Sequence, residues 1–258
     1  MDLPLVLLAG GLGTRLREET EVKPKPMIEI GGRPIMWHIM KYYAAFGAQE
    51  FVICLGYKGD VIKDYFLNYG LRRGSVTIDL RSRQVELHND EVPEAWRVHL
   101  LETGNDTMTG GRTKRAASFL GRRRFMLTYG DGLSNVDISG LLDFHMQHGR
   151  IATITGVRPP ARFGGLTLSD DLVQRFDEKP QVGEGWINGG FMILEPEITD
   201  YIEGDSSILE RAPMERLAAD GQLVAYRHDA FWQCVDTVRD LNVLREIWEG
   251  GNAPWKIW

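Results

Sequence analysis

A glycine-rich loop near the start of the chain has the composition of an anion-binding loop. Residues 9–15 read Ala-Gly-Gly-Leu-Gly-Thr-Arg and follow an apolar run. Glycines at such a place let backbone N–H groups surround an anion, such as a triphosphate, without side chains in the way. Two familiar patterns do not fit, because Lys-Ser/Thr does not follow the last glycine and the spacing G-x-G-x-x-G is missing. On the glycines alone, a plain structural turn is an equally good interpretation.

Two cations beside this loop favour the anion-binding interpretation. Arg15 ends the loop, and Lys25 follows between Pro24 and Pro26. Proline fixes φ and disfavours helix at the residue before it, so this segment can hold an ammonium group at a defined place. A single lysine is more often a solvated surface residue. In combination with the glycine loop and Arg15, we interpret Lys25 as a phosphate-binding residue.

The elements around these residues alternate between strand and helix. Apolar runs predict strands at 3–9, 51–56, 97–102, 124–129, 151–157, 187–194 and 223–226. Helical spacing predicts helices at 35–43, 60–69, 113–120, 138–148, 208–220 and 237–249. Two-residue alternation predicts hairpins over 75–88 and around a turn at 170–171.

This alternation predicts one α/β domain over residues 1–258, with a mostly parallel sheet covered by helices on both faces. Ligands of such sheets bind beyond the carboxyl ends of the strands, and the glycine loop lies at one of these ends.

Composition narrows the class of protein and its compartment. Apolar residues make up 43% and charged residues 26%, which is ordinary globular usage and predicts neither disorder nor a membrane protein. The apolar start is too short for a membrane span and lacks the basic residues of a secretory signal. Cys54 and Cys234 are far apart without metal-type spacing, which predicts a reducing compartment, the cytoplasm. A formal charge of −6 argues against a nucleic-acid partner.

The sequence also resembles a known family over essentially its whole length. LAGGLGTRLREETEVKPKPMIEIGGRPI resembles the opening signature of the sugar-phosphate nucleotidylyltransferases. TGNDTMTGGR, YGDG, RFGG, FDEKP, NGGF, FWQCVDT and APWKIW are similar, in the same order, to the branch that uses CTP and glucose 1-phosphate. The thymidylyl and uridylyl branches usually have proline in place of Glu18 and asparagine in place of Gly132. Cys234 stands where that branch usually has proline.

The resemblance implies a Rossmann-like core with an inserted sugar-binding region, a homo-oligomer and a Mg²⁺ cofactor. The implied reaction joins CTP to glucose 1-phosphate, giving CDP-glucose and pyrophosphate. A phosphate monoester with a second pKa of about 6 is already ionised near neutrality. The enzyme therefore needs no general base, only positioning and charge neutralisation.

The resemblance also assigns site residues. The implied nucleotide-binding residues are Leu8, Ala9, Gly10, Gly11, Leu12, Gly13, Thr14, Arg15, Lys25, Asp106, Gly111, Arg112 and Gly130. Arg15, Lys25 and Asp131 are implied to be catalytic, and Asp131 and Asp236 to bind Mg²⁺. The implied sugar-binding residues are Gly164, Glu178, Lys179 and Asn188. Because both metal-binding aspartates follow predicted strands, we expect their carboxylates to meet.

Several of these residues have a second interpretation. Asp106 is placed to accept from the cytosine amino group, and Arg112 to donate to O2 or N3. The two residues fit equally well as an exposed loop and the first turn of a helix. Asp236 precedes a predicted helix and could cap it. Glu178 and Lys179, beside a proline, are also ordinary loop residues.

Three other functions fit part of the sequence. The same transfer with UTP or dTTP needs only a different base-binding segment. A nucleotide-sugar sensor that binds without turnover is disfavoured, because binding alone does not need Asp131 and Asp236 together with Arg15 and Lys25. An NAD-dependent enzyme is disfavoured by the glycine spacing and by the lack of a clear ribose-binding acid.

Overall fold

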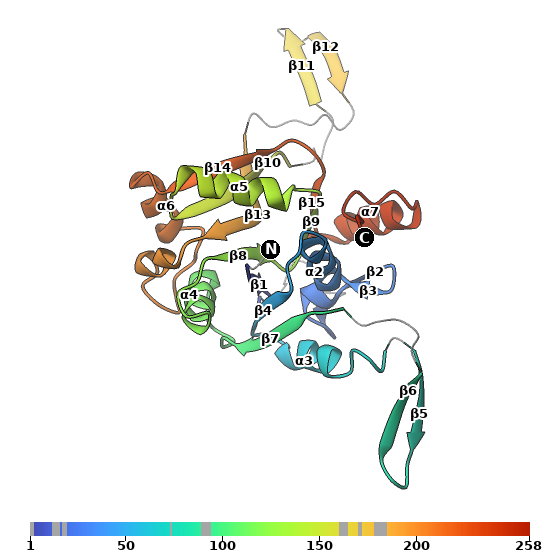
Figure 1. The fold of residues 1–258 in the computed structure, drawn as a ribbon. Helices are drawn as coiled ribbons and strands as arrows, with labels where there is room; N and C mark the ends of the chain where they lie inside the picture. Colours follow the sequence, from blue (N-terminus) through green and yellow to red (C-terminus); the bar gives the residue numbers. More distant parts are fainter. Residues whose placement is uncertain are drawn as a thin grey trace.

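A seven-stranded sheet forms the centre of the molecule (Figure 1). The computed structural model describes residues 3–11, 16, 20–72, 74–88, 94–159, 165–169, 172–177 and 185–258. The strand order is β14-β10-β13-β8-β1-β4-β7. In chain order these strands are β1 (Leu5–Leu8), β4 (Glu50–Leu55), β7 (Arg97–Glu102), β8 (Phe125–Tyr129), β10 (Ala152–Val157), β13 (Ile187–Leu194) and β14 (Leu223–His228).

The sheet is mostly parallel, as the sequence predicts. β1 runs parallel to β4 and β8, β4 to β7, and β10 to β14. β13 is antiparallel to both of its neighbours, β10 and β8. Each predicted strand is present, with ends that differ by no more than two residues.

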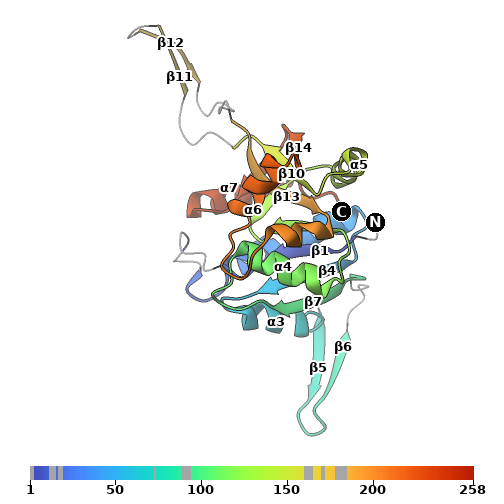
Figure 2. The ribbon, with the colours of Figure 1, turned by 90° about the vertical axis from the view of Figure 1, so that its left-hand side faces the viewer.

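Helices cover both faces of the sheet (Figures 1 and 2). They are α2 (Ile35–Ala45), α3 (Gly59–Leu67), α4 (Thr109–Phe119), α5 (Ile138–His148), α6 (Ala212–Ala219) and α7 (Val238–Glu249), with 3₁₀ turns η2 (Lys25–Met27) and η3 (Pro196–Tyr201). Successive side chains of a strand point to opposite faces of the sheet, so the hydrophobic core has two parts. Leu5 and Leu7 of β1 join α2, α3, α5 and α7 in one core, while Val6 and Leu8 join α4, α6 and η3 in the other. Within the described residues, no helix is long and apolar enough to cross a membrane.

Two hairpins project from this body (Figures 1 and 2). They are β5 (Ser75–Asp79) with β6 (Gln84–His88), and β11 (Gly165–Ser169) with β12 (Leu172–Asp177). Both hairpins are predicted from the alternation in the sequence, although the expected turn at 170–171 lies outside the described residues.

Two helix starts differ from the prediction. The helix expected at 113 begins at Thr109, because Gly110 and Gly111, which are poor helix formers, are accepted in its buried first turn. A Cβ atom on Gly110 would lie 2.6 Å from the backbone oxygen of Ser207, so close packing requires glycine there. The helix expected at 208 begins at Ala212, because Pro213 is tolerated only in a first turn.

Two short strand pairs have no counterpart in the prediction. β2 (Glu29–Ile30) pairs with β3 (Arg33–Pro34), and β9 (Gly132–Ser134) pairs with β15 (Trp232–Cys234). Two or three residues are too few for a periodic pattern to be recognised.

A buried histidine joins α2 to the C-terminal segment. His38 has no exposed surface, and the rings of Trp248 and Trp255 pack against it. Its Nε2 lies 2.8 Å from the backbone oxygen of Ile30 and so carries the proton, while Nδ1 accepts from the Trp255 indole at 3.4 Å. Burial lowers the pKa of His38 to about 4, because desolvation of the imidazolium outweighs the hydrogen bond to Ile30.

We therefore expect acid to destabilise the fold through His38. The unfolded chain has the ordinary pKa of about 6.5 and takes up the proton first as the pH falls. The contribution of His38 is complete above about pH 6.5 and is lost toward pH 4, at up to about 1.4 kcal/mol per pH unit. Melting temperatures from pH 7.5 to 5 should fall more steeply for the wild type than for His38→Gln, which cannot titrate. Parallel profiles of the two proteins would contradict this assignment.

Candidate active site

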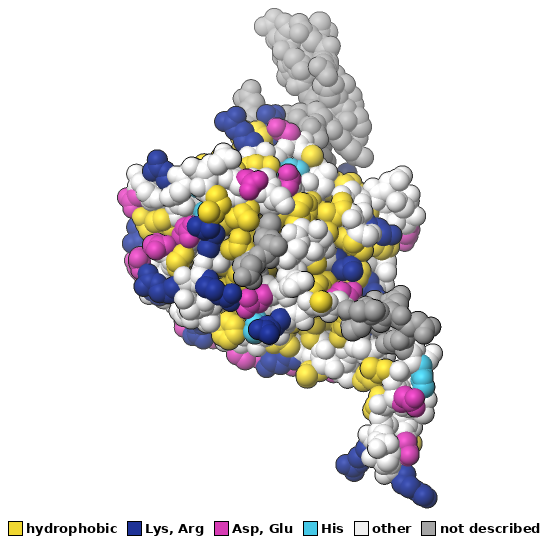
Figure 3. All heavy atoms as spheres, viewed as in Figure 1, with side chains coloured by type: hydrophobic (Ala, Val, Ile, Leu, Met, Phe, Trp, Pro, Cys, Tyr) yellow, Lys and Arg dark blue, Asp and Glu magenta, His cyan; other side chains and the backbone are white. Residues whose placement is uncertain are grey.

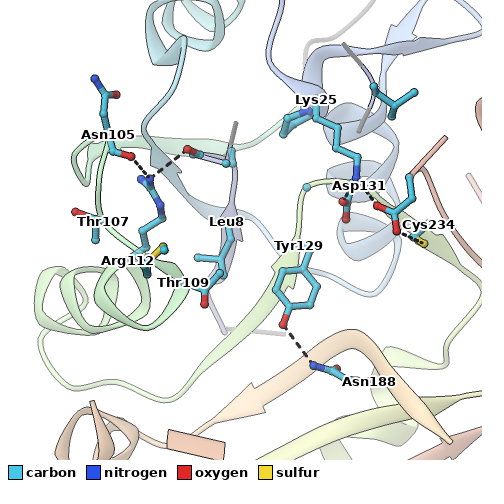
Figure 4. A pocket seen from close by; sticks show the side chains of 18 of the residues that line it. Leu8, Lys25, Asn105, Thr107, Thr109, Arg112, Tyr129, Asp131, Asn188 and Cys234 are labelled. Atoms are coloured by element: carbon cyan, nitrogen blue, oxygen red, sulfur yellow. Dashed lines mark hydrogen bonds and ion pairs between the residues drawn. The ribbon is translucent and has the colours of Figure 1, made fainter. Parts of the chain in front are cut away.

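A cavity of about 760 Å³ lies beyond the carboxyl ends of β1 and β8 (Figure 4). Small-molecule sites commonly have this volume. The residues assigned from the sequence that line it are Leu8, Ala9, Gly10, Gly11, Lys25, Asp106, Arg112, Gly130, Asp131, Asn188 and Asp236. The structure thus brings together residues from segments that are widely spaced along the chain. Seven other assigned residues lie outside the described part of the chain, namely Leu12, Gly13, Thr14, Arg15, Gly164, Glu178 and Lys179.

At one side of the cavity, a single ammonium group bridges two carboxylates. Nζ of Lys25 lies 2.5 Å from Oδ2 of Asp131 and 3.0 Å from Oδ1 of Asp236. The two carboxylate oxygens can therefore be no farther apart than the sum of these distances. Burial alone would lower the pKa of Lys25, but the charges and hydrogen bonds of Asp131 and Asp236 outweigh burial and raise it. The lysine is therefore charged at neutral pH.

Short local elements place these three side chains. Lys25 begins η2, where Pro24 accepts from Met27 at 2.8 Å and so closes a tight turn. Asp131 follows β8, as expected, but Asp236 does not follow a strand of the central sheet. It follows β15, whose pairing with β9 places Cys234 opposite Gly132. The two aspartates meet because of this short antiparallel pair, and not because two parallel strands end together.

The alternative role of Asp236 as a helix cap is wrong. The N-cap of α7 is Thr237, whose hydroxyl accepts from the backbone of Asp240 at 3.2 Å. The Asp240 carboxylate in turn accepts from the backbone N–H groups of Asp236 and Thr237, which completes a capping box. The side chain of Asp236 is thus directed to Lys25 and not to the helix end.

Cys234, where the resembled branch usually has proline, faces the same aspartate. Its Sγ lies 3.9 Å from Oδ2 of Asp236. Burial, with Asp236 and Asp131 next in effect, raises the pKa of the Cys234 thiol to about 12. The Cys234 side chain is therefore a neutral thiol. Cys54 also forms no disulfide, and it is buried in the core that contains Val6 and Leu8.

Arg112 lies beneath the glycine loop and is only 4% exposed. Its terminal nitrogens donate to the backbone oxygens of Leu55 at 2.8 Å, Gly10 at 3.1 Å and Asn105 at 3.3 Å, and to the Thr103 hydroxyl at 2.6 Å. A contact of these terminal nitrogens with a base, the role expected from the sequence, would require one of these bonds to break or to be shared. In this structure Arg112 holds the glycine loop against the ends of β4 and β7, and its contact with a base stays a prediction.

Close packing explains several glycines of the site. A Cβ atom on Gly10 would lie 2.2 Å from the Arg112 guanidinium, and one on Gly130 would lie 2.7 Å from the ring of Pro26. Gly111, expected to bind the nucleotide, packs against the 205–207 segment, where a Cβ atom would lie 2.6 Å from Cα of Asp205, and its nucleotide binding stays a prediction. The contacts of Gly10 and Gly130 thus bring neighbouring segments close together in the wall of the cavity.

Two aromatic residues of the cavity have no role in the sequence-based assignment. Tyr129 is the last residue of β8, and Trp232 belongs to β15, with its indole donating to the backbone oxygen of Gly189 at 2.8 Å. The place of Tyr129 in the motif YGDG, directly before Gly130 and Asp131, is a signal that could have identified it. Trp232 has a similar signal, because it stands in the motif FWQCVDT, four residues before Asp236.

A mostly parallel sheet with a glycine loop and clustered charges at its carboxyl edge is the arrangement of nucleotide-binding α/β proteins. The chain belongs to the nucleotidyl transferase family, whose model matches residues 5–243. It is 50% identical to a glucose-1-phosphate cytidylyltransferase of Salmonella typhi, over 98% of both chains. It is 43% identical to a probable glucose-1-phosphate cytidylyltransferase of Bacillus subtilis, over 98% of this chain and 99% of that protein.

The fold agrees with solved structures. HddC from Yersinia pseudotuberculosis superposes with a TM-score of 0.70 at 26% identity, covering 95% of this chain and 99% of the other. The family resemblance and the α/β fold class stated from the sequence are therefore confirmed.

Lys25 gives the first test of the site. We expect Lys25→Ala to keep the fold and to lose about two to three orders of magnitude in kcat for nucleotidyl transfer, the scale of removing one preorganised charge. Lys25→Arg should rescue poorly, because a planar fork does not replace a compact ammonium between two carboxylates. Steady-state pyrophosphate release measures both variants, and circular dichroism checks the fold. A rate near that of the wild type in Lys25→Ala would return Lys25 to a surface role.

Proposed function

We propose that this chain transfers a cytidylyl group from CTP to α-D-glucose 1-phosphate, giving CDP-glucose and pyrophosphate. The observation that carries this proposal is the 50% identity, over 98% of both chains, with the cytidylyltransferase of Salmonella typhi. The cavity supports it, because a glycine loop, a lysine and two aspartates line one space at the switch point of the sheet.

The reaction needs positioning and charge neutralisation more than proton transfer. A phosphate oxygen of the sugar phosphate attacks the α-phosphorus of CTP in line, and the bond from that phosphorus to the pyrophosphate oxygen breaks. The backbone N–H groups of Gly10 and Gly11 bind phosphate oxygens, and the Lys25 ammonium neutralises charge developing at the α-phosphate. Within this proposal, Arg15 adds a second cation to the loop, and Gly164, Glu178, Lys179 and Asn188 bind the sugar phosphate.

Mg²⁺ fits the donors that the cavity offers. Within the described residues, no group of three or more His, Cys, Asp or Glu side chains could enclose a metal ion. Mg²⁺ does not need such a cage, because it keeps several waters and binds one or two carboxylates with substrate phosphates. Asp131 and Asp236 would hold it, and its chemistry would be to neutralise the reacting phosphates. Lys25 already shows that these two carboxylates accept one shared cation.

Two rival functions remain distinct from this proposal. Transfer from UTP or dTTP would use the same phosphate site with another base-binding segment. A sensor would bind nucleotide sugar without turnover, and the pair of aspartates at Lys25 argues against it, because binding alone does not need them. Pyrophosphate release separates all three possibilities.

We also propose a homo-oligomer in the cytoplasm. Four aliphatic side chains on one face of the β5–β6 hairpin are paired across the strands, Val76 with Leu87 and Ile78 with Val85, and each is at least 37% exposed. Figure 3 shows mainly the other face of this hairpin, which carries acidic side chains and a histidine. An isolated two-stranded hairpin is marginally stable in water, so contact with a second copy would stabilise it. Sedimentation velocity of the wild type and of Ile78→Glu tests the assembly, and a monomeric wild type would refute it.

The base preference follows from the cytidylyl-type stretch at 104–112, where Asp106 lines the cavity. A site that hydrogen-bonds one base edge rejects a mismatched base strongly, because buried partners are left unpaired. We expect kcat/KM for CTP to exceed that for UTP and dTTP by at least about a hundredfold. Pyrophosphate release with ATP, CTP, GTP, UTP and dTTP measures this, and Asp106→Ala should narrow the preference. Equal turnover of UTP would refute CTP as the donor.

The metal proposal predicts strong coupling between the two aspartates. EDTA should abolish activity, and Mg²⁺ should restore it. Asp131→Asn and Asp236→Asn should each lose most of the rate, and the double variant should lose little more, because residues that act through one ion are not additive. Full additivity of the two losses, or activity that survives EDTA, would contradict a shared metal.

A further inference from the structure

An exposed carboxylate next to the cavity contacts two residues that line it. Glu210 lies in the segment between η3 and α6, and its Oε2 accepts from the hydroxyl of Thr109, the first residue of α4, at 2.7 Å. Its Oε1 accepts from the hydroxyl of Tyr129, at the end of β8. Thr109 and Tyr129 line the cavity, whereas Glu210 is not among its lining residues.

The contact with Glu210 fixes the direction of the hydrogen bond between Tyr129 and Asn188. An ionised carboxylate only accepts, so Tyr129 donates its single hydrogen to Glu210. The Tyr129 oxygen is then an acceptor, and Nδ2 of Asn188 lies 3.3 Å from it (Figure 4). Oδ1 of Asn188 accepts from the backbone N–H of Gly190 at 2.9 Å. The Asn188 amide therefore has one orientation, with a second N–H available to a ligand.

Packing and charge hold Tyr129 in this role. Gly190 has φ +83°, and a Cβ atom there would lie 2.5 Å from the Tyr129 ring, so the ring rests directly on the glycine backbone. Burial, and after it the Glu210 charge, raises the pKa of Tyr129, so its hydroxyl keeps the proton. The ring is thus fixed by packing, whereas the direction of its O–H bond is set by Glu210.

We propose that Glu210 is a positioning residue that orients the Asn188 amide through the Tyr129 hydroxyl, and thereby sets the affinity for the sugar 1-phosphate. The identity of this ligand rests on the proposed function, whereas the chain of hydrogen bonds does not. Without Glu210, the Tyr129 hydroxyl is free to turn its hydrogen toward Asn188, and the amide N–H then loses its acceptor. The amide would then be held by the Gly190 N–H alone, and its second N–H would be directed less firmly toward a sugar hydroxyl or phosphate oxygen.

Kinetics of matched variants test this proposal. Glu210→Ala should raise KM for glucose 1-phosphate about tenfold, the scale of one oriented hydrogen bond, with kcat and KM for CTP changed less than about twofold. Glu210→Gln should recover most of the loss, because its amide oxygen can still accept from Tyr129. Glu203→Ala, in the same segment and exposed, is the control and should behave as the wild type. An unchanged KM in Glu210→Ala, or an equal change in the control, would overturn the proposal.

A double variant tests whether Glu210 acts through Tyr129. Tyr129→Phe removes the oxygen that accepts from Asn188, so adding Glu210→Ala to it should raise KM no further. Additive effects of the two substitutions would show that Glu210 acts by another route and would overturn the proposal.

A readout without turnover separates this inference from the proposed function. In ¹⁵N-labelled protein, the side-chain NH₂ resonances of Asn188, assigned by their loss in Asn188→Asp, should shift in Glu210→Ala and not in Glu203→Ala. A shift in a protein that does not turn over CTP and glucose 1-phosphate would support the positioning role and refute the proposed function. Turnover in the wild type with unmoved resonances in Glu210→Ala would refute the positioning role alone.

Discussion

The Lys25 ammonium between Asp131 and Asp236 is the interaction on which the geometry of the site depends. It joins η2, the end of β8 and the turn before α7. Two half-buried carboxylates that both lie within 3.0 Å of one ammonium nitrogen would repel each other if no cation lay between them. With one lysine the group still carries a net negative charge. This charge repels an anionic triphosphate unless a further cation accompanies it, which agrees with the divalent ion proposed above.

The opposite wall of the cavity has the reverse charge. Arg112 is buried under the glycine loop, and no salt bridge to a carboxylate is found for it within the described residues. Backbone oxygens and one hydroxyl satisfy its donors without neutralising its charge, so a positive potential remains beneath Gly10. Burial lowers the pKa of Arg112, yet a guanidinium stays protonated far above neutral pH. The cavity is therefore cationic beneath the loop and anionic at Asp131 and Asp236, a polarity that orients a phosphate chain along it.

The sequence predicts an element well where its hydrophobic pattern extends over many residues. It predicts poorly the short elements and side-chain positions that depend on tertiary contacts. The strands of the sheet and the helix at 138–148 follow from apolar runs and helical spacing. The β9–β15 pair does not, because three residues give no period, and yet this pair brings Asp236 to Asp131. The motif that contains Arg112 can be recognised in the sequence. The burial of the Arg112 side chain is a tertiary property, and no sequence pattern shows it. Glu210 carries no motif, and only the fold brings it to Tyr129.

The antiparallel strand β13 explains why the sugar side of the cavity begins with a strand start. In an all-parallel sheet, the residues at this edge come from the carboxyl ends of strands. β13 runs against β8, with Met192 opposite Leu127, so the first residues of β13 reach the edge where β8 ends. Asn188 therefore lies beside Tyr129, and Gly190 supports the Tyr129 ring. A single reversal of strand direction thus sets the Asn188 amide next to the strand whose following residues include Asp131, so that the proposed sugar-binding and phosphate-binding residues lie at one strand end.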